Sequence, residues 1–231
     1  MTEPLILLPG MMCDARLFGP QIMEFGRTRA VHLPPISGHD TVEALAAEIL
    51  ENAPKTFALA GLSMGGIVAM EVFRQAPLRV SRMCLMDTSA LPETPVHAAS
   101  REPLIVKVMA GRLAEVVTDD MKPNYLAPGA GRQAVLDLVL DMALGLGEGV
   151  FVRQTRALQR RPDQQSTIRK LRVPTLVLCG EHDTLCPVSR HQFMADLVGH
   201  AKLEVVSGAG HLPTLEQPDA VIAAMTKWLN A

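Results

Sequence analysis

The pentapeptide Gly-Leu-Ser-Met-Gly at residues 61–65 constrains the fold of this chain more than any other feature. Residues 55–60 before it are mostly apolar and typical of a strand, whereas residues 66–73 after it are typical of a helix. Between a strand and a helix, a Gly-x-Ser-x-Gly pattern indicates a very tight turn, which admits no bulky side chain two positions before or after the serine. Such a turn would hold Ser63 at strained dihedral angles and expose its hydroxyl above the sheet.

Strand-like and helix-like segments alternate along much of the chain. The expected strands are residues 5–8, 29–33, 57–62, 82–87, 173–180 and 202–206. The expected helices between and after them cover about 42–50, 64–76, 189–197 and 218–229, the first opened by an N-cap pattern at residues 40–43. This alternation predicts an α/β fold of about six mostly parallel strands, flanked by helices on both faces.

Residues 91–172 interrupt the alternation. They contain apolar helical patterns near 104–109, 113–117, 135–144 and 150–158, but no good strand. We therefore expect a core made of residues 1–90 and 173–231, with residues 91–172 inserted between the fourth and fifth strands as a helical cap.

Two further residues stand where strands end. Asp183 follows the fifth expected strand, and His211 lies on a glycine-rich loop after the sixth. A serine hydroxyl needs an imidazole base to become a nucleophile, and the imidazole needs a carboxylate to orient it and stabilise its cation. Taken singly, Asp183 could cap a helix and His211 could be an ordinary loop residue. Together with Ser63, in the chain order serine, acid, histidine, they predict a catalytic triad.

Composition excludes several other classes of function. The 231 residues fit one domain, and 48% of them are hydrophobic. A net charge of −2 and 3% aromatic residues disfavour nucleic-acid binding. We expect no signal peptide and no membrane span, because the apolar runs are short and the first residues include an acid.

The four cysteines form no Cys-x-x-Cys pair, which favours free thiols in a reducing cytoplasm. Cys179, His182 and Cys186 are possible zinc ligands by residue type, but they lack the close ligand pairs of zinc knuckles. We therefore expect neither a metal nor an organic cofactor.

The segments around these residues resemble the α/β-hydrolase fold family over nearly the whole chain. Residues 8–11 are similar to the family's His-Gly loop, although Pro9 stands where histidine is common. Residues 180–187 resemble its acid segment, and residues 210–218 resemble its histidine segment. The chain looks most like small capped carboxylesterases, such as pimeloyl-carrier-protein methyl ester esterases and enol-lactone hydrolases.

The resemblance implies an oxyanion hole formed by two backbone N–H groups. One belongs to Met64, directly after the serine, and the other by alignment to Met11. Donors of this kind usually make the largest electrostatic contribution to acyl transfer.

The sequence thus predicts a serine hydrolase that cleaves an ester, thioester or lactone through an acyl-enzyme. Two alternatives stay open: cofactor-free haloperoxidase or perhydrolase chemistry on the same triad, and a non-catalytic ligand-binding module. The acyl and leaving groups, and the oligomeric state, do not follow from these patterns.

Three other features of the sequence allow both a structural and a functional interpretation. Asp87 also ends a strand, where some relatives carry their acid, but a cap or loop role is the better interpretation. His39 is expected to pack in a loop rather than to contact substrate. The cap is richer in basic than in acidic residues, and Arg153, Arg156 and Arg160 share one face of an expected helix. That face is ordinarily solvated. The sharper hypothesis is that it docks an anionic carrier, such as acyl-carrier protein or a coenzyme A phosphate, so that the small-molecule acyl substrate would be carrier-linked.

Overall fold

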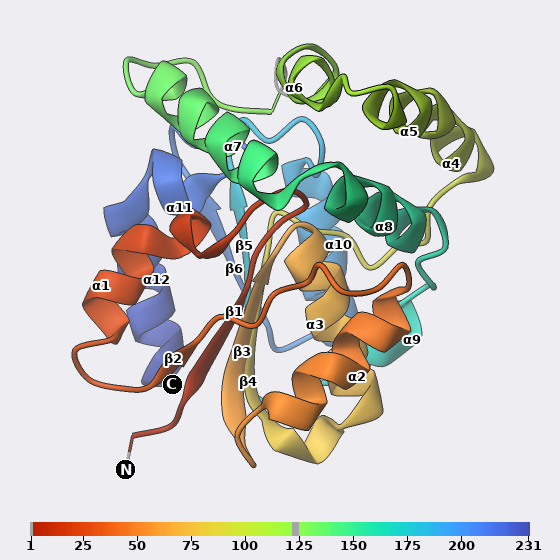
Figure 1. Ribbon diagram of the computed structural model, residues 1–231. Coiled ribbons are helices and arrows are strands. Elements are labelled where there is room, and N and C mark those ends of the chain that lie inside the picture. Colours follow the sequence, from red (N-terminus) through yellow and green to blue (C-terminus); the bar gives the residue numbers. More distant parts are fainter. Residues whose placement is uncertain (1, 122–124) are drawn as a thin grey trace.

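The computed structural model describes residues 2–121 and 125–231, and its core is a six-stranded sheet (Figure 1). The strands lie in the order β2-β1-β3-β4-β5-β6, and every neighbouring pair is parallel. Their bounds are β1 (Leu5–Leu8), β2 (Val31–His32), β3 (Phe57–Leu62), β4 (Val80–Met86), β5 (Thr175–Gly180) and β6 (Lys202–Val206). The prediction of about six parallel strands is confirmed.

Side chains of the sheet divide between two apolar clusters because successive residues of a strand point to opposite faces. In β3, Ala58, Ala60 and Leu62 belong to one cluster, whereas Phe57 and Leu59 belong to the other. Central strands buried on both faces need apolar residues at every position, which is why β1 and β3 read as continuous apolar runs.

Helices cover both faces of the sheet. The first cluster receives α1 (Gly19–Phe25) and α12 (Pro218–Leu229), with α11 (Pro213–Glu216) beside them. The second receives α2 (Val42–Asn52), α3 (Met64–Gln75), α9 (Gln165–Ile168) and α10 (Val188–Val198). Two short 3-10 helices, Ala15–Phe18 and Pro77–Arg79, connect these elements.

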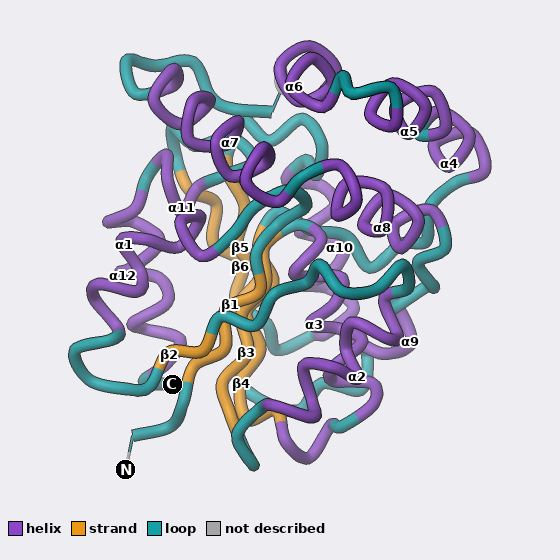
Figure 2. The backbone as a smooth tube through the Cα atoms, viewed as in Figure 1, coloured by secondary structure: helices purple, strands orange, loops and turns teal. Residues whose placement is uncertain are grey.

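Between β4 and β5 the described chain contains helix and loop but no strand (Figure 2). Besides α9, the helices there are α4 (Pro95–Ser100), α5 (Glu102–Met109), α6 (Leu113–Glu115), a π-helix at Val116–Met121, α7 (Arg132–Leu146) and α8 (Glu148–Gln159). They lie across the carboxyl ends of the strands (Figure 1). Phe151 and Leu158 of α8 are buried in the two different sheet clusters, so this helical insertion packs directly onto the core.

One local expectation was wrong by a residue. The N-cap of α2 is Thr41, not Asp40, and its Oγ1 accepts a hydrogen bond of 3.3 Å from the Ala44 N–H. Thr41 has extended dihedral angles, whereas Asp40 is exposed and pairs with Arg160. None of the helices in the described ranges has the length and apolarity needed to cross a bilayer.

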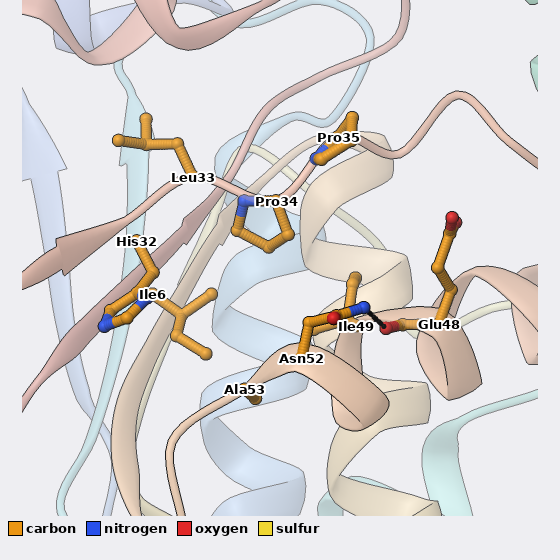
Figure 3. A pocket seen from close by; sticks show the side chains of 9 residues that line it. All are labelled: Ile6, His32, Leu33, Pro34, Pro35, Glu48, Ile49, Asn52 and Ala53. Carbon is orange, nitrogen blue, oxygen red and sulfur yellow. Dashed lines mark hydrogen bonds between the residues drawn. The ribbon is translucent and has the colours of Figure 1, made fainter.

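A pocket of about 370 Å³ opens between β1, the end of β2 and α2, and Figure 3 shows the side chains that line it. Proline, leucine and isoleucine side chains form much of its wall, and Asn52 donates a hydrogen bond there to the Glu48 carbonyl. None of the residues predicted to be catalytic lines it.

Candidate active site

Ser63 occupies a strained turn between β3 and α3. Its φ of 56° and ψ of −117° lie in a region that non-glycine residues rarely adopt. Its N–H donates to the Met86 carbonyl of β4 at 2.9 Å, which extends the sheet pairing past the end of β3. A Cβ at Gly61 would collide with the Gly65 carbonyl, and one at Gly65 with the Leu8 carbonyl. Both glycines of the motif are therefore required by close backbone approach.

Three side chains from distant parts of the chain meet at this turn. His211 Nε2 lies 2.9 Å from Ser63 Oγ, and His211 Nδ1 lies 2.8 Å from Asp183 Oδ2. Asp183 follows β5 and His211 follows β6, so parallel strands deliver all three residues to one edge of the sheet. Asp183 and His211 are buried, whereas Ser63 is half-buried.

The carboxylate of Asp183 is fixed by its own loop. Its Oδ1 accepts hydrogen bonds from the N–H groups of Leu185 at 2.8 Å and Cys186 at 3.0 Å. Burial raises the pKa of Asp183, but bonds to His211 and Cys186 outweigh this and lower it overall. Asp183 is thus a carboxylate aligned to hold the proton of His211 on Nδ1.

Asp87 lies beside Asp183 but is placed differently. It is fully buried at a φ of 44°, and its Oδ1 accepts a hydrogen bond of 2.9 Å from the Gly180 N–H. Its Oδ2 receives no N–H or O–H donor from the described residues. Burial, and next the charge of Asp183, raise the pKa of Asp87 far above its usual range, so Asp87 is a protonated neighbour.

The loop that carries His211 is held by Glu216 at the end of α11. Glu216 accepts hydrogen bonds from the N–H groups of Gly210 at 3.0 Å and Leu212 at 2.9 Å, on both sides of the histidine. It also accepts one of 2.7 Å from Ala127 in the insertion. The His211 N–H donates to the Tyr125 carbonyl at 2.6 Å, and the Tyr125 ring packs edge-on against the imidazole. The histidine loop is therefore tied to the helical insertion.

The loop after β1 faces Ser63 from the other side. Met12 has a φ of 55°, and its N–H donates to Gln154 Oε1 of α8 at 2.8 Å. The amide of Gln154 donates in turn to the Ile36 carbonyl at 2.9 Å. In the described part of the chain, the N–H groups of Met11 and Met64 make no hydrogen bond. The fold therefore leaves both of these backbone donors unengaged within that part of the chain.

Comparison with known proteins shows the family of this chain. The model of the alpha/beta hydrolase family matches residues 5–224. The chain belongs to this family. The prediction of the fold class and the resemblance from which it came are confirmed.

Among curated relatives of this α/β-hydrolase, the pimeloyl-[acyl-carrier protein] methyl ester esterase of Aromatoleum aromaticum is 26% identical, covering 82% of this chain and 83% of its own. The enzyme of that name from Klebsiella pneumoniae is 27% identical, covering 94% and 89%. A malate-bound thermophilic esterase from Thermogutta terrifontis has a TM-score of 0.90 at 27% identity, covering 100% and 90%. An enol-lactonase from Burkholderia xenovorans LB400, 20% identical with a TM-score of 0.90 and coverage of 100% and 92%, shows the fold alone.

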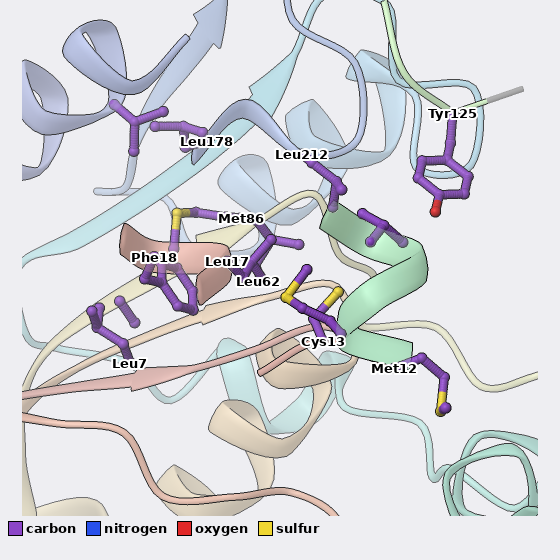
Figure 4. Close-up of a cluster of buried hydrophobic side chains, with 14 of the residues drawn as sticks. Leu7, Met12, Cys13, Leu17, Phe18, Leu62, Met86, Tyr125, Leu178 and Leu212 are labelled. Carbon is purple, nitrogen blue, oxygen red and sulfur yellow. The ribbon is translucent and has the colours of Figure 1, made fainter. Parts of the chain in front are cut away.

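A cavity of about 370 Å³ opens above Ser63 and His211 in this α/β-hydrolase. Its apolar wall contains Met11, Leu104 and Leu212. Cys13 also lines it and belongs to the buried apolar cluster with Leu62 and Leu212 that Figure 4 shows. Burial raises the pKa of Cys13 to about 12, so its thiol is a small apolar side chain here.

Of the other residues singled out in the sequence, His39, Cys179 and His182 do not line the cavity above Ser63. His39 is exposed near Glu48, 3.6 Å away. Within the described ranges, the possible ligands close enough to share an ion are Asp183, Cys186 and His211. That set excludes Cys179 and His182, and burial raises the pKa of Cys186 to about 12, so it is a thiol rather than a thiolate ligand.

The basic face of α8 is largely engaged within the chain. Arg156 pairs with Glu102, and Arg160 with Asp40. Arg153 Nε donates to the Ser37 carbonyl at 2.8 Å.

Three residues that support the loops around Ser63 and His211 are not predicted from the sequence. Gln154 carries no motif signal. Glu216 lies in the segment that resembles the family's histidine segment, but its role was not predicted, because it acts on backbone groups brought near only by the fold. Thr88 follows β4, and its Oγ1 donates to the Ser63 carbonyl at 2.7 Å. The position of Thr88 just after a strand end was the one available signal.

Proposed function

We propose that this protein is a serine carboxylesterase-type hydrolase that cleaves an acyl ester through Ser63, His211 and Asp183. The unbroken hydrogen-bond chain from Ser63 Oγ through His211 to Asp183 carries this proposal. The esterase names of relatives that match most of both chains support ester cleavage as the reaction.

In the proposed reaction, His211 Nε2 takes the proton of Ser63 as the serine oxygen attacks the ester carbonyl. Asp183 keeps the other imidazole proton on Nδ1 and stabilises the imidazolium. His211 then gives its proton to the departing alcohol, which leaves an acyl-enzyme. Water activated by the same histidine releases the acid and restores Ser63.

The N–H groups of Met64 and Met11 would hold the oxyanion of each tetrahedral intermediate. Met64 begins α3, so its N–H points out of the helix at the positive end of the macrodipole. Removal of one such donor typically costs on the order of 3–4 kcal/mol of transition-state stabilisation. Because these donors are backbone groups, they are tested through the residues that position their loops.

Residues 91–172 would act as a cap that closes the cavity and selects the substrate. The apolar wall of the cavity suits an acyl chain. The relatives' names include an acyl-carrier protein, so a carrier-linked acyl group is one form of the substrate. If α8 docks such a carrier, reversing Arg153 and Arg156 to glutamate should raise KM for a carrier-linked ester and spare a small free ester.

A panel of esters, thioesters and lactones of graded acyl length tests the function, with Ser63→Ala as the blank. We expect hydrolysis of at least one ester series by the wild-type protein and none above background by Ser63→Ala. Equal hydrolysis by both proteins, or activity that requires added peroxide and halide, would refute the proposal.

A further inference from the structure

A second cavity, of about 210 Å³, adjoins the first and has a different lining. The two share Ser63, His211, Arg101, Glu93, His97, Leu158 and Leu185. The smaller cavity extends from the serine toward Arg161 and Arg190, whereas the larger extends toward Met11, Leu104 and Leu212. The space around the serine is therefore mostly apolar on the side of the larger cavity, where Asp120 also lies, and basic on the side of the smaller one.

The basic side holds more positive than negative charge. Glu93 is the acidic side chain in its wall, and only 3% of that side chain is exposed. Arg101 donates to Glu93 Oε2 at 3.0 Å, and Arg161 Nη1 lies 3.6 Å from the same oxygen. Two guanidinium groups thus share one carboxylate.

The arginines retain unused capacity for hydrogen bonds. Arg161 is 12% exposed, and its Nε has no partner in the described part of the chain. Burial lowers the pKa of Arg161 even though Glu93 opposes this, as expected for a cation with too little counter-charge. No carboxylate of the described residues pairs with Arg190.

We propose that the wall formed by Arg101, Arg161 and Arg190, called here the arginine wall, binds a free carboxylate of the substrate. The substrate class is then a hemiester, in which one carboxyl of a dicarboxylic acid is esterified and the other is ionised. Guanidinium groups suit this task because they donate paired hydrogen bonds to carboxylates and remain charged. This inference rests on the proposed ester cleavage at Ser63, because the arginine wall borders that serine.

The kinetic test compares the monomethyl and dimethyl esters of succinate, adipate and suberate, with methanol release measured by chromatography. For the best chain length, we expect kcat/KM for the monomethyl ester to exceed that for the dimethyl ester at least tenfold. In Arg161→Met and Arg190→Met, the ratio of kcat/KM for the monomethyl ester to kcat/KM for the dimethyl ester should fall at least about tenfold. Arg27→Met is the matched control, since Arg27 is exposed near Glu24, and its ratio should stay at the wild-type value.

A binding test separates this inference from the proposed function. Ser63→Ala should bind monomethyl adipate at least tenfold more tightly than dimethyl adipate in calorimetry, and Arg190→Met added to it should remove the difference. Because no acidic side chain within residues 2–121 and 125–231 pairs with Arg190, this variant should fold even if Arg161→Met does not. Hydrolysis or binding without preference for the monomethyl esters would overturn the carboxylate site and leave the esterase standing. A binding preference for the monomethyl ester without hydrolysis of any ester would support the carboxylate site and refute the proposed ester cleavage.

Discussion

At the scale of single residues, the strained backbone of Ser63 depends on Thr88. Besides the hydrogen bond from its Oγ1 to the Ser63 carbonyl, Thr88 donates its N–H to His191 Nε2 at 3.0 Å. Burial lowers the pKa of His191 to about 4, so the ring is neutral and Nε2 can accept. His191 Nδ1 then donates to the Pro187 carbonyl, 3.3 Å away. A short buried chain of hydrogen bonds thus braces the serine turn.

We predict that Thr88→Val lowers kcat about three- to tenfold and leaves KM nearly unchanged. Valine keeps the shape of threonine but removes the hydroxyl donor, and one neutral hydrogen bond contributes about 1 kcal/mol. Steady-state kinetics on the best ester of the panel measures the effect. Thr28→Val is the control, because the Thr28 hydroxyl donates to the nearby Phe25 carbonyl at 3.3 Å, in a turn that does not carry Ser63. A Thr88→Val enzyme with wild-type kcat would show that this brace is unnecessary.

The two neighbouring carboxyl groups should respond oppositely to amide substitution. Asp183→Asn should lower kcat by about 10³- to 10⁴-fold, because an amide cannot hold the proton of His211 on Nδ1. Asp87→Asn should keep most of the activity, because an amide replaces a protonated carboxyl with little change in charge or shape. If Asp87→Asn instead abolished activity and Asp183→Asn did not, the acid would be Asp87.

The same pair predicts a signed dependence of stability on pH. The raised pKa of Asp87 means that the folded state keeps a proton that the unfolded state releases above about pH 4, so Asp87 costs stability as pH rises from there. The lowered pKa of Asp183 has the opposite sign, and its contribution is lost only as pH falls below about 4. The difference in Tm, Asp87→Asn minus wild type, should therefore increase as the pH rises from 5 to 8. A constant difference would mean that Asp87 is already ionised when folded.

At the scale of elements, Gln154 connects α8 to the loop that carries Met11. It satisfies the Met12 N–H and the Ile36 carbonyl at once and is only 1% exposed. The helical insertion thereby positions one of the proposed oxyanion donors.

We predict that Gln154→Leu lowers kcat at least about tenfold and also destabilises the protein. Two buried backbone groups would lose their partners, at about 1–3 kcal/mol each. Gln133→Leu on α7 is the control, since the side-chain amide of exposed Gln133 donates to exposed Asp137. Stopped-flow acylation kinetics on the folded fraction separates the two effects. Acylation at the wild-type rate would contradict a role for Gln154 in positioning the oxyanion loop.

The elements show what periodicity can and cannot predict. β1, β3 and β6 have the bounds expected from their apolar runs, and α12 begins at Pro218 as predicted. β2 is shorter than expected, because only Val31 and His32 pair with β1. Helices α1, α4, α9 and α11 were not predicted. Most are short, and their formation depends on packing rather than on a repeated apolar stripe.

At the scale of the whole molecule, parallel topology makes the site predictable. Each β-α crossover returns the chain to the same edge, so Ser63, Asp183 and His211 could be associated from their positions after strands. The residues that support them could not, because Thr88, Gln154 and Glu216 contact backbone groups that are adjacent only in space. The arginine wall is also a tertiary feature, since its residues come from the junction of α4 and α5, from α10 and from the segment after α8.

The central claim is that Ser63 is the nucleophile, and labelling with a fluorophosphonate followed by peptide mass spectrometry tests it most directly. The geometry predicts one adduct, on Ser63, in the wild-type protein and none in Ser63→Ala. In His211→Gln, labelling should be slower by orders of magnitude, because the base that activates the serine is lost. An adduct on any other residue, or an unlabelled wild-type protein, would contradict the claim.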